Sequence, residues 1–99
     1  MIVKEKIKKE NLQTPFTKAV ADIERGIMAV GCELHFDCAE ELMQDGSASK
    51  NLWGFNIYPD KSLDFVSLIN IRPAEHNRSM KIEDQEICRK IQAIADTFL

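Results

Sequence analysis

The side chains best suited to chemistry lie close together between positions 32 and 38. Cys32, His35 and Cys38 have the spacing Cys-x-x-His-x-x-Cys, and thiolate and imidazole groups are the usual protein ligands of zinc. On a strand, however, side chains 32 and 35 point to opposite faces of the sheet and cannot meet at one ion. We therefore predict no metal site and no cofactor, and we expect Cys32, Cys38 and Cys88 to be free, buried thiols.

Three polar residues alternate over the same stretch. Glu33, His35 and Asp37 would share one strand face, an arrangement suited to acid–base chemistry. Asp37 is better explained as the cap of a following helix, and a polar, solvated face is the default for an antiparallel sheet. His35 is the best single candidate for moving a proton, because histidine titrates near neutral pH.

The densest polar cluster is the segment 72–79, Arg-Pro-Ala-Glu-His-Asn-Arg-Ser. Arg72, Asn77 and Arg78 could surround a phosphate or a carboxylate, because a guanidinium group offers paired donors to such anions. The alternative is that the polar side chains make turn hydrogen bonds while the arginines pair with nearby glutamates. No glycine-rich phosphate loop or dinucleotide fingerprint accompanies the cluster.

The first half of the chain has the pattern of a hairpin followed by a helix. Residues 19–23 and 27–35 predict two antiparallel strands joined at Gly26. Large apolar side chains repeat every second residue along the second strand and should face the core: Met28, Val30, Cys32, Leu34 and Phe36. A short helix is then expected, with Asp37 as its N-cap and Gly46 just past its end.

The second half predicts two more strands and a longer helix. Residues 52–58 and 65–72 form the predicted strands, and Asp84 caps a helix over 85–98 that has an apolar stripe. One antiparallel register keeps an apolar face of Trp53, Phe55 and Ile57 against Ile71, Ile69 and Ser67. The same register sets Gly54, Asn56 and Tyr58 beside Asn70, Leu68 and Val66 on a polar face that ends near Arg72.

These elements give the order β-β-β-α-β-β-α when a doubtful first strand over 2–7 is included. We predict a single α+β domain over 1–99, with an antiparallel or mixed sheet of four to five strands and both helices packed on one face. His35 and Arg72 would then emerge on the other face and border one concave surface, with Arg78 at its rim. Arg72 would be exposed, so that its replacement by alanine should hardly alter stability.

Composition narrows the classes of partner. The chain has 13 basic and 16 acidic residues and a formal charge of −3. Nucleic-acid binding is not expected, because it depends on basic side chains that neutralise phosphates. No apolar run approaches the roughly 20 residues that cross a bilayer, and the N-terminus lacks the apolar stretch of a signal peptide. The odd number of cysteines fits a reducing compartment. We expect a cytoplasmic protein, and a homodimer is left open.

Four segments resemble a family of small prokaryotic proteins catalogued as a domain of unknown function. They are residues 22–35, 52–59, 69–73 and 77–79, and the first is the most specific. The chain departs from that family in having Cys32 where its members tend to have glycine. The resemblance implies no activity, substrate or catalytic residue, and it gives no role to Cys32.

Three hypotheses about function remain. The first is a binding or regulatory module that holds a small anionic ligand or an acidic partner on the polar sheet face. The second is a small hydrolase or phosphoryl-transfer enzyme that uses His35 with Arg72 and Arg78. The third is a structural interaction protein that adds its sheet or a helix to another chain. The candidate ligand-binding residues are Glu33, His35, Asn56, Tyr58, Asn70, Arg72, Asn77 and Arg78.

Overall fold

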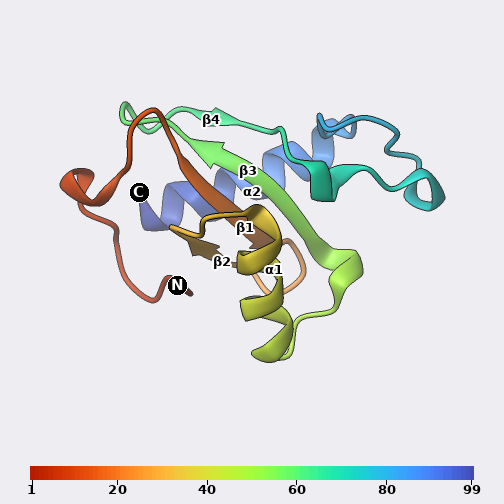
Figure 1. The fold of residues 1–99 in the computed structure, drawn as a ribbon, viewed down its shortest axis with the longest axis horizontal. Coiled ribbons are helices and arrows are strands. Elements are labelled where there is room, and N and C mark those ends of the chain that lie inside the picture. The colour runs from red at the N-terminus through yellow and green to blue at the C-terminus, as the bar shows by residue number, and fades with distance from the viewer.

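Four strands form one antiparallel sheet in the order β2-β1-β3-β4 (Figure 1). The structure is a computed structural model that describes residues 1–99. The strands are β1 (Thr17–Asp22), β2 (Ile27–Val30), β3 (Leu52–Ile57) and β4 (Leu63–Asp64), and the helices are α1 (His35–Gln44) and α2 (Gln85–Phe98). The predicted α+β class, with an antiparallel sheet and two helices, is confirmed.

The β1–β2 hairpin has the turn that the sequence predicts. Gly26 adopts φ 68°, a conformation that glycine reaches without steric cost. The turn is also held by the preceding carboxylate, because Asp22 Oδ1 accepts hydrogen bonds from the backbone N–H groups of Glu24 and Arg25, each at 2.9 Å. The side chain of Asp22 is therefore a turn element buried at the end of β1.

Strand β2 is much shorter than predicted. It ends at Val30, and Gly31 follows with φ 79°, which turns the chain away from the sheet. Helix α1 then begins at His35, with Leu34 as the N-cap residue, and the Asp37 carboxylate accepts a hydrogen bond from the Leu34 N–H at 3.2 Å. The predictions of a strand through His35 and of Asp37 as the N-cap are both wrong.

The two helices cover opposite faces of the sheet, so the prediction that both pack on one face is wrong. Figure 1 shows α1 in front of the sheet and α2 behind it. One apolar cluster joins α2 to Trp53, Phe55 and Ile57 of β3, and a separate cluster joins α1 to Val20 of β1 and Leu52 of β3. Both faces of β1 and β3 are buried because a helix covers each face, and every residue of the two strands except the half-buried Lys18 is buried.

Helix α2 agrees with its prediction at both ends. It spans Gln85–Phe98, and the Asp84 carboxylate accepts a hydrogen bond from the Glu86 N–H at 2.8 Å. Ile91 and Ala95 have no exposed surface and pack in the larger cluster. The predicted first strand over 2–7 is reduced to one bridge between Ile2 and Ala29 at the free edge of β2.

Residues 65–72 do not form the predicted strand. Strand β4 pairs only Leu63 and Asp64 with the end of β3, and the next residues turn through a 3-10 helix over Leu68–Asn70. The segment nevertheless runs beside β3, as Figure 1 shows for the stretch that follows β4. Its side chains, rather than its backbone, complete the outer edge of β3, and this difference determines the geometry of the candidate site.

Candidate functional site

His35 stands in the first turn of α1 with its ring over β3. Its Nε2 lies 3.0 Å from the Phe55 carbonyl oxygen and 2.8 Å from Asn56 Oδ1. Both partners are acceptors, so Nε2 carries the hydrogen and donates to them, which leaves Nδ1 of the neutral ring as an acceptor. Burial lowers the pKa of His35 below 6.5 although the two hydrogen bonds oppose that shift. The hydrogen bonds fix the orientation of the ring, and burial favours its neutral form.

A hollow of about 330 Å³ opens beside this ring, and we call it the His35 hollow. Its walls come from the start of α1 and from the segment that follows β4. The lining is mostly apolar, and Lys18 and Ser67 are its other polar members. The lining residues are Lys18, Leu34, His35, Phe36, Val66, Ser67, Leu68, Ile69 and Met80.

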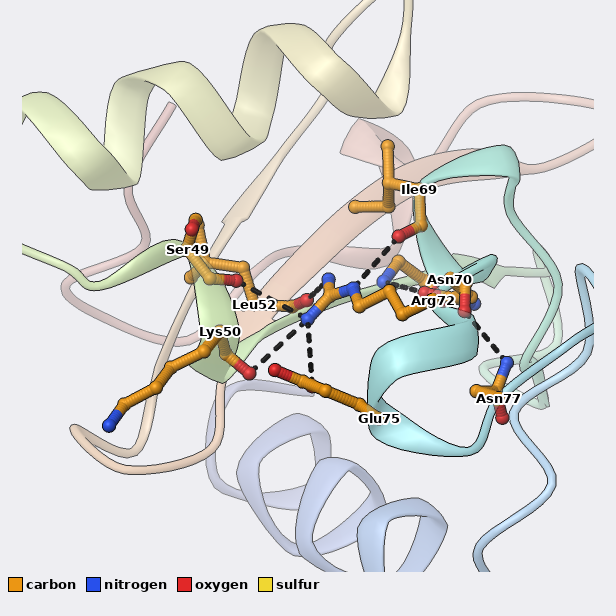
Figure 2. Close-up of polar contacts among 9 residues, drawn as sticks. Ser49, Lys50, Leu52, Ile69, Asn70, Arg72, Glu75 and Asn77 are labelled. Atoms are coloured by element: carbon orange, nitrogen blue, oxygen red, sulfur yellow. Dashed lines mark hydrogen bonds and ion pairs between the residues drawn. The ribbon is translucent and has the colours of Figure 1, made fainter.

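Arg72 lies at the outer edge of β3, near the start of that strand. Its guanidinium donates to the backbone carbonyl oxygens of Ile69 at 3.1 Å, Ser49 at 3.3 Å, Lys50 at 3.2 Å and Leu52 (Figure 2). Its Cζ is 4.3 Å from the centroid of the Trp53 ring. The side chain is 18% exposed, so the expectation of an exposed arginine is wrong.

The charge of Arg72 is balanced within the chain. Nη1 lies 3.7 Å from Glu75 Oε2, three residues along in the sequence. Burial lowers the pKa of Arg72, and the Glu75 carboxylate partly offsets this, although arginine remains protonated in proteins. Because its donors already reach four carbonyl oxygens and a carboxylate, Arg72 has little capacity left for a phosphate or carboxylate ligand.

Asn70 and Asn77 are buried structural residues. Asn70 Nδ2 donates to the Gly54 and Met80 carbonyl oxygens, while its Oδ1 accepts from the Gly54 N–H. Asn77 Nδ2 is 2.7 Å from the Asn70 carbonyl oxygen, a contact drawn in Figure 2, and its Oδ1 accepts from the Glu83 N–H at 2.8 Å. Both amides bond backbone groups and so hold the segment from Asn70 to Glu83 in place. This agrees with the alternative that the polar side chains of the segment make turn hydrogen bonds.

The remaining candidate residues are dispersed. Asn56 is buried and bridges His35 to the Val66 carbonyl oxygen at 3.1 Å. Tyr58 follows the far end of β3, and its ring packs edge-on against Phe16. Glu33 is exposed, and its carbonyl oxygen accepts a hydrogen bond from Lys18 Nζ at 2.7 Å.

Arg78 does not line the His35 hollow. It is exposed, and its backbone N–H donates to Glu83 Oε2 at 2.8 Å while its guanidinium has no partner. The structure therefore brings together only part of the predicted set, namely His35 with Asn56 on one side and Arg72 with Asn70 and Asn77 on the other.

A second hollow of about 280 Å³ adjoins Arg72, and we call it the Arg72 hollow. Phe36 and Ile69 line both hollows, so the two are neighbours along one side of α1. We refer to them together as the α1 trough. The residues of the Arg72 hollow are Phe36, Ala39, Met43, Ser49, Lys50, Leu52, Ile69, Arg72 and Glu75.

Sequence reasoning missed the exposed apolar side chains of this trough. Leu34 is 59% exposed, Phe36 53%, Leu68 71% and Met80 41%, and all four line the His35 hollow. Periodicity predicts Leu34 and Phe36 in the core, because they continue the alternation of β2, and the strand register predicts Leu68 on a polar sheet face. The signal that could have corrected this was Gly31, which interrupts the strand before them.

The cysteine prediction is wrong as well. Cys32 and Cys38 form a disulfide, with Cα atoms 5.7 Å apart, and only Cys88 is free. The strand geometry assumed for positions 32 to 38 does not exist there, because the chain turns and enters α1, which brings the two sulfurs together. The number of cysteines therefore no longer supports the prediction of a reducing compartment.

No group of three or more His, Cys, Asp or Glu side chains is placed to hold a metal ion. None of the helices has both the length and the apolar character needed to cross a bilayer.

Comparison with known proteins identifies a family for this chain. No curated protein and no solved structure matches the chain significantly. One family model, described as "Protein of unknown function (DUF5674)", matches residues 1–98, nearly the whole chain. The resemblance to a domain of unknown function is thus confirmed, and the chain belongs to the DUF5674 family.

Proposed function

We propose that this protein is a binding module whose α1 trough takes a short amphipathic segment of another protein, with apolar side chains seated in the two hollows and acidic residues beside them. The observation that carries the proposal is the clustering of four exposed apolar side chains around one hollow. Exposed apolar side chains that gather around one hollow are typical of binding sites. This develops the binding-module hypothesis, with the trough in place of an open sheet face.

The charges of the trough favour an acidic partner. Lys18 lines the His35 hollow, and Lys50 and Arg72 line the Arg72 hollow. The only carboxylate in either lining is Glu75, which is paired with Arg72. A cationic lining in a chain of net charge −3 would steer acidic segments to the trough and repel basic ones.

The geometry gives less support to a small anionic ligand or to a hydrolase. Arg72 is engaged by carbonyl oxygens of its own chain, and Arg78 lies outside both hollows. His35 is held by Phe55 and Asn56 and faces apolar walls. No nucleophilic side chain is hydrogen-bonded to His35, although catalysis by a nucleophile and a base needs that contact.

The location of the protein in the cytoplasm stays a prediction from its sequence.

The proposal is tested by titrating isotope-labelled protein with peptides that carry two leucine or phenylalanine residues flanked by Asp and Glu. Chemical-shift changes should map to both hollows, and a peptide with Lys in place of the acidic residues should bind more weakly. Shift changes confined to another face, or none for any acidic apolar peptide, would refute the proposal.

Matched variants make the test specific. Leu68→Ser should weaken binding because it removes a 71% exposed apolar contact at little cost in stability. Ile71→Ser is its control, since Ile71 is 42% exposed and lines neither hollow. Lys50→Glu should weaken binding of the acidic peptides, whereas Lys90→Glu on α2, across the sheet, should not. If Leu68→Ser instead turned a dimer into a monomer in light scattering, the trough would be filled by a second copy and the proposal would be wrong.

A further inference from the structure

We propose that the Cys32–Cys38 disulfide is a reversible thiol–disulfide site whose reduction in the folded protein loosens the wall of the α1 trough. The inference rests on the proposed function for its consequence in binding, but the redox chemistry and the loosening are measured without any partner. Nothing in the family description assigns a role to this pair.

The position of the disulfide links it to the trough. The two cysteines are six positions apart and close a loop over residues 32–38. That loop contains Leu34, His35 and Phe36, the three α1-side residues that line the His35 hollow. The bond therefore ties the end of β2 to the first turn of α1 around the residues that form one wall of the hollow.

Few other contacts hold this wall. The N-cap residue of α1 is Leu34, whose side chain cannot accept a hydrogen bond, so the helix start lacks the usual side-chain cap. Its ties to the sheet are the bonds from His35 Nε2 to Phe55 and Asn56, from Lys18 Nζ to the Glu33 carbonyl oxygen and from the Gly31 N–H to the Lys18 carbonyl oxygen. Within the helix start, the Asp37 carboxylate accepts a hydrogen bond from the Leu34 N–H. A segment with so few anchors depends on its covalent link for local stability.

The two sulfurs differ in access. Cys38 has no exposed surface and packs between α1 and the sheet, whereas Cys32 is partly exposed. A thiolate of a dithiol reductant attacks Cys32 Sγ, and the bond to Cys38 Sγ breaks. The Cys38 thiolate takes up a proton. The second thiolate of the reductant then attacks the reductant sulfur of the mixed disulfide and releases Cys32 as a thiol. The reductant is oxidised to its disulfide and supplies both electrons.

The first measurement counts thiols in the folded protein, with Cys88→Ala as the background so that only the pair reacts. Treatment with dithiothreitol without denaturant, followed by alkylation, should label Cys32 first and Cys38 more slowly. The far-UV circular dichroism spectrum of the protein should keep most of its folded signal, because the sheet and α2 persist. If the bond resists reduction until the protein unfolds globally, the proposal is wrong.

The second measurement is amide hydrogen exchange of the oxidised and reduced protein. Exchange over residues 33–40 should accelerate on reduction by about tenfold to a hundredfold, the range that loop closure by a short disulfide loop gives. Amides of α2 should not change. The variant with both Cys32→Ser and Cys38→Ala should reproduce the reduced pattern, which separates the lost bond from side effects of the reductant. Unchanged exchange over 33–40 in the reduced protein would overturn the proposal.

The third measurement separates this inference from the proposed function. An acidic apolar peptide that binds the oxidised protein should bind the reduced protein several-fold more weakly, and equal affinities would overturn the regulatory part. If no such peptide binds in either state, the proposed function has failed, while thiol labelling and hydrogen exchange still decide the redox inference.

Discussion

The side-chain amide of Asn70 takes the place of a neighbouring strand beside Gly54. Its Oδ1 accepts from the Gly54 N–H at 2.8 Å and its Nδ2 donates to the Gly54 carbonyl oxygen at 2.9 Å. Along the same edge of β3, Arg72 satisfies the Leu52 carbonyl oxygen and Asp64 of β4 pairs with Asn56. Two side chains and a short strand thus protect an edge that would otherwise expose unpaired backbone groups.

Replacing Asn70 with aspartate should destabilise the protein by about 2–5 kcal/mol, because it leaves the buried Gly54 carbonyl oxygen without a donor and places a carboxylate oxygen against it. The introduced carboxyl should regain a donor when it is protonated, so part of the loss should recover as the pH falls. Denaturant unfolding at several pH values measures both effects. Ser79→Ala, which removes an exposed hydroxyl bonded to Lys81, is the control and should cost less than about 1 kcal/mol.

Gly54 is required by the close approach of Ser67. A Cβ added at Gly54 would lie 2.5 Å from Ser67 Cβ and 3.1 Å from Ile69 Cγ1. Gly54→Ala should therefore destabilise by about 1–3 kcal/mol through overpacking.

The double variant Gly54→Ala with Ser67→Gly tests that explanation. It should be more stable than the sum of the single effects predicts, with a coupling of about 0.5–3 kcal/mol in denaturant unfolding. Additive effects would show that the strain lies elsewhere.

The sequence was most informative where local chemistry and tertiary packing agree. The hairpin at Gly26 and the Asp84 cap of α2 follow from turn and capping preferences that the fold does not override. The adjacency of Gly54 and Asn70 was also predicted, from the apolar register. What the pattern could not show is that a side-chain amide, rather than a backbone strand, makes the contact.

The site was harder to predict than the fold because one residue changes its geometry. Leu34 and Phe36 continue the alternation of β2, so periodicity placed them in the core and His35 on a polar sheet face. Gly31, with φ 79°, ends the strand, and the same residues become the first turn of α1. The disulfide and the exposed apolar wall both follow from that turn, which no periodic pattern reveals.

The burial of neutral His35 should make stability depend on pH. Its pKa in the folded protein is lowered by desolvation, from 6.5 in the absence of burial. The unfolded state therefore binds more protons below pH 6.5, so the stability that His35 contributes is present above that pH and is lost as the pH falls through the lowered folded pKa. Thermal or denaturant unfolding between neutral and acidic pH measures this loss.

Two variants test whether His35 causes this dependence of stability on pH. His35→Gln should flatten the decline, because glutamine can donate to the Phe55 carbonyl oxygen without titrating. His76→Asn should leave it unchanged, since His76 is exposed and asparagine tolerates its φ of 61°. A decline that survives His35→Gln would show that other groups cause it.

Arg72 should matter for stability, contrary to the expectation from an exposed loop arginine. Its guanidinium supplies donors to four carbonyl oxygens around the start of β3 and lies over the Trp53 ring. A hydrogen bond to a charged group contributes about 1.5–3 kcal/mol. The exposed Ser49 and Lys50 carbonyl oxygens can bond water instead, so the part-buried bonds to Ile69 and Leu52 account for most of the expected loss. Arg72→Met, which retains apolar bulk but no donor, should cost about 2–4 kcal/mol in denaturant unfolding.

Arg72→Lys should recover only part of this loss, because one ammonium cannot reproduce the planar fork of the guanidinium group. Arg78→Met, which removes an exposed and unpaired guanidinium, should change stability by less than about 0.5 kcal/mol. If Arg72→Met and Arg78→Met proved equally harmless, the edge of β3 would not depend on the guanidinium, and the structural role assigned to Arg72 would be wrong.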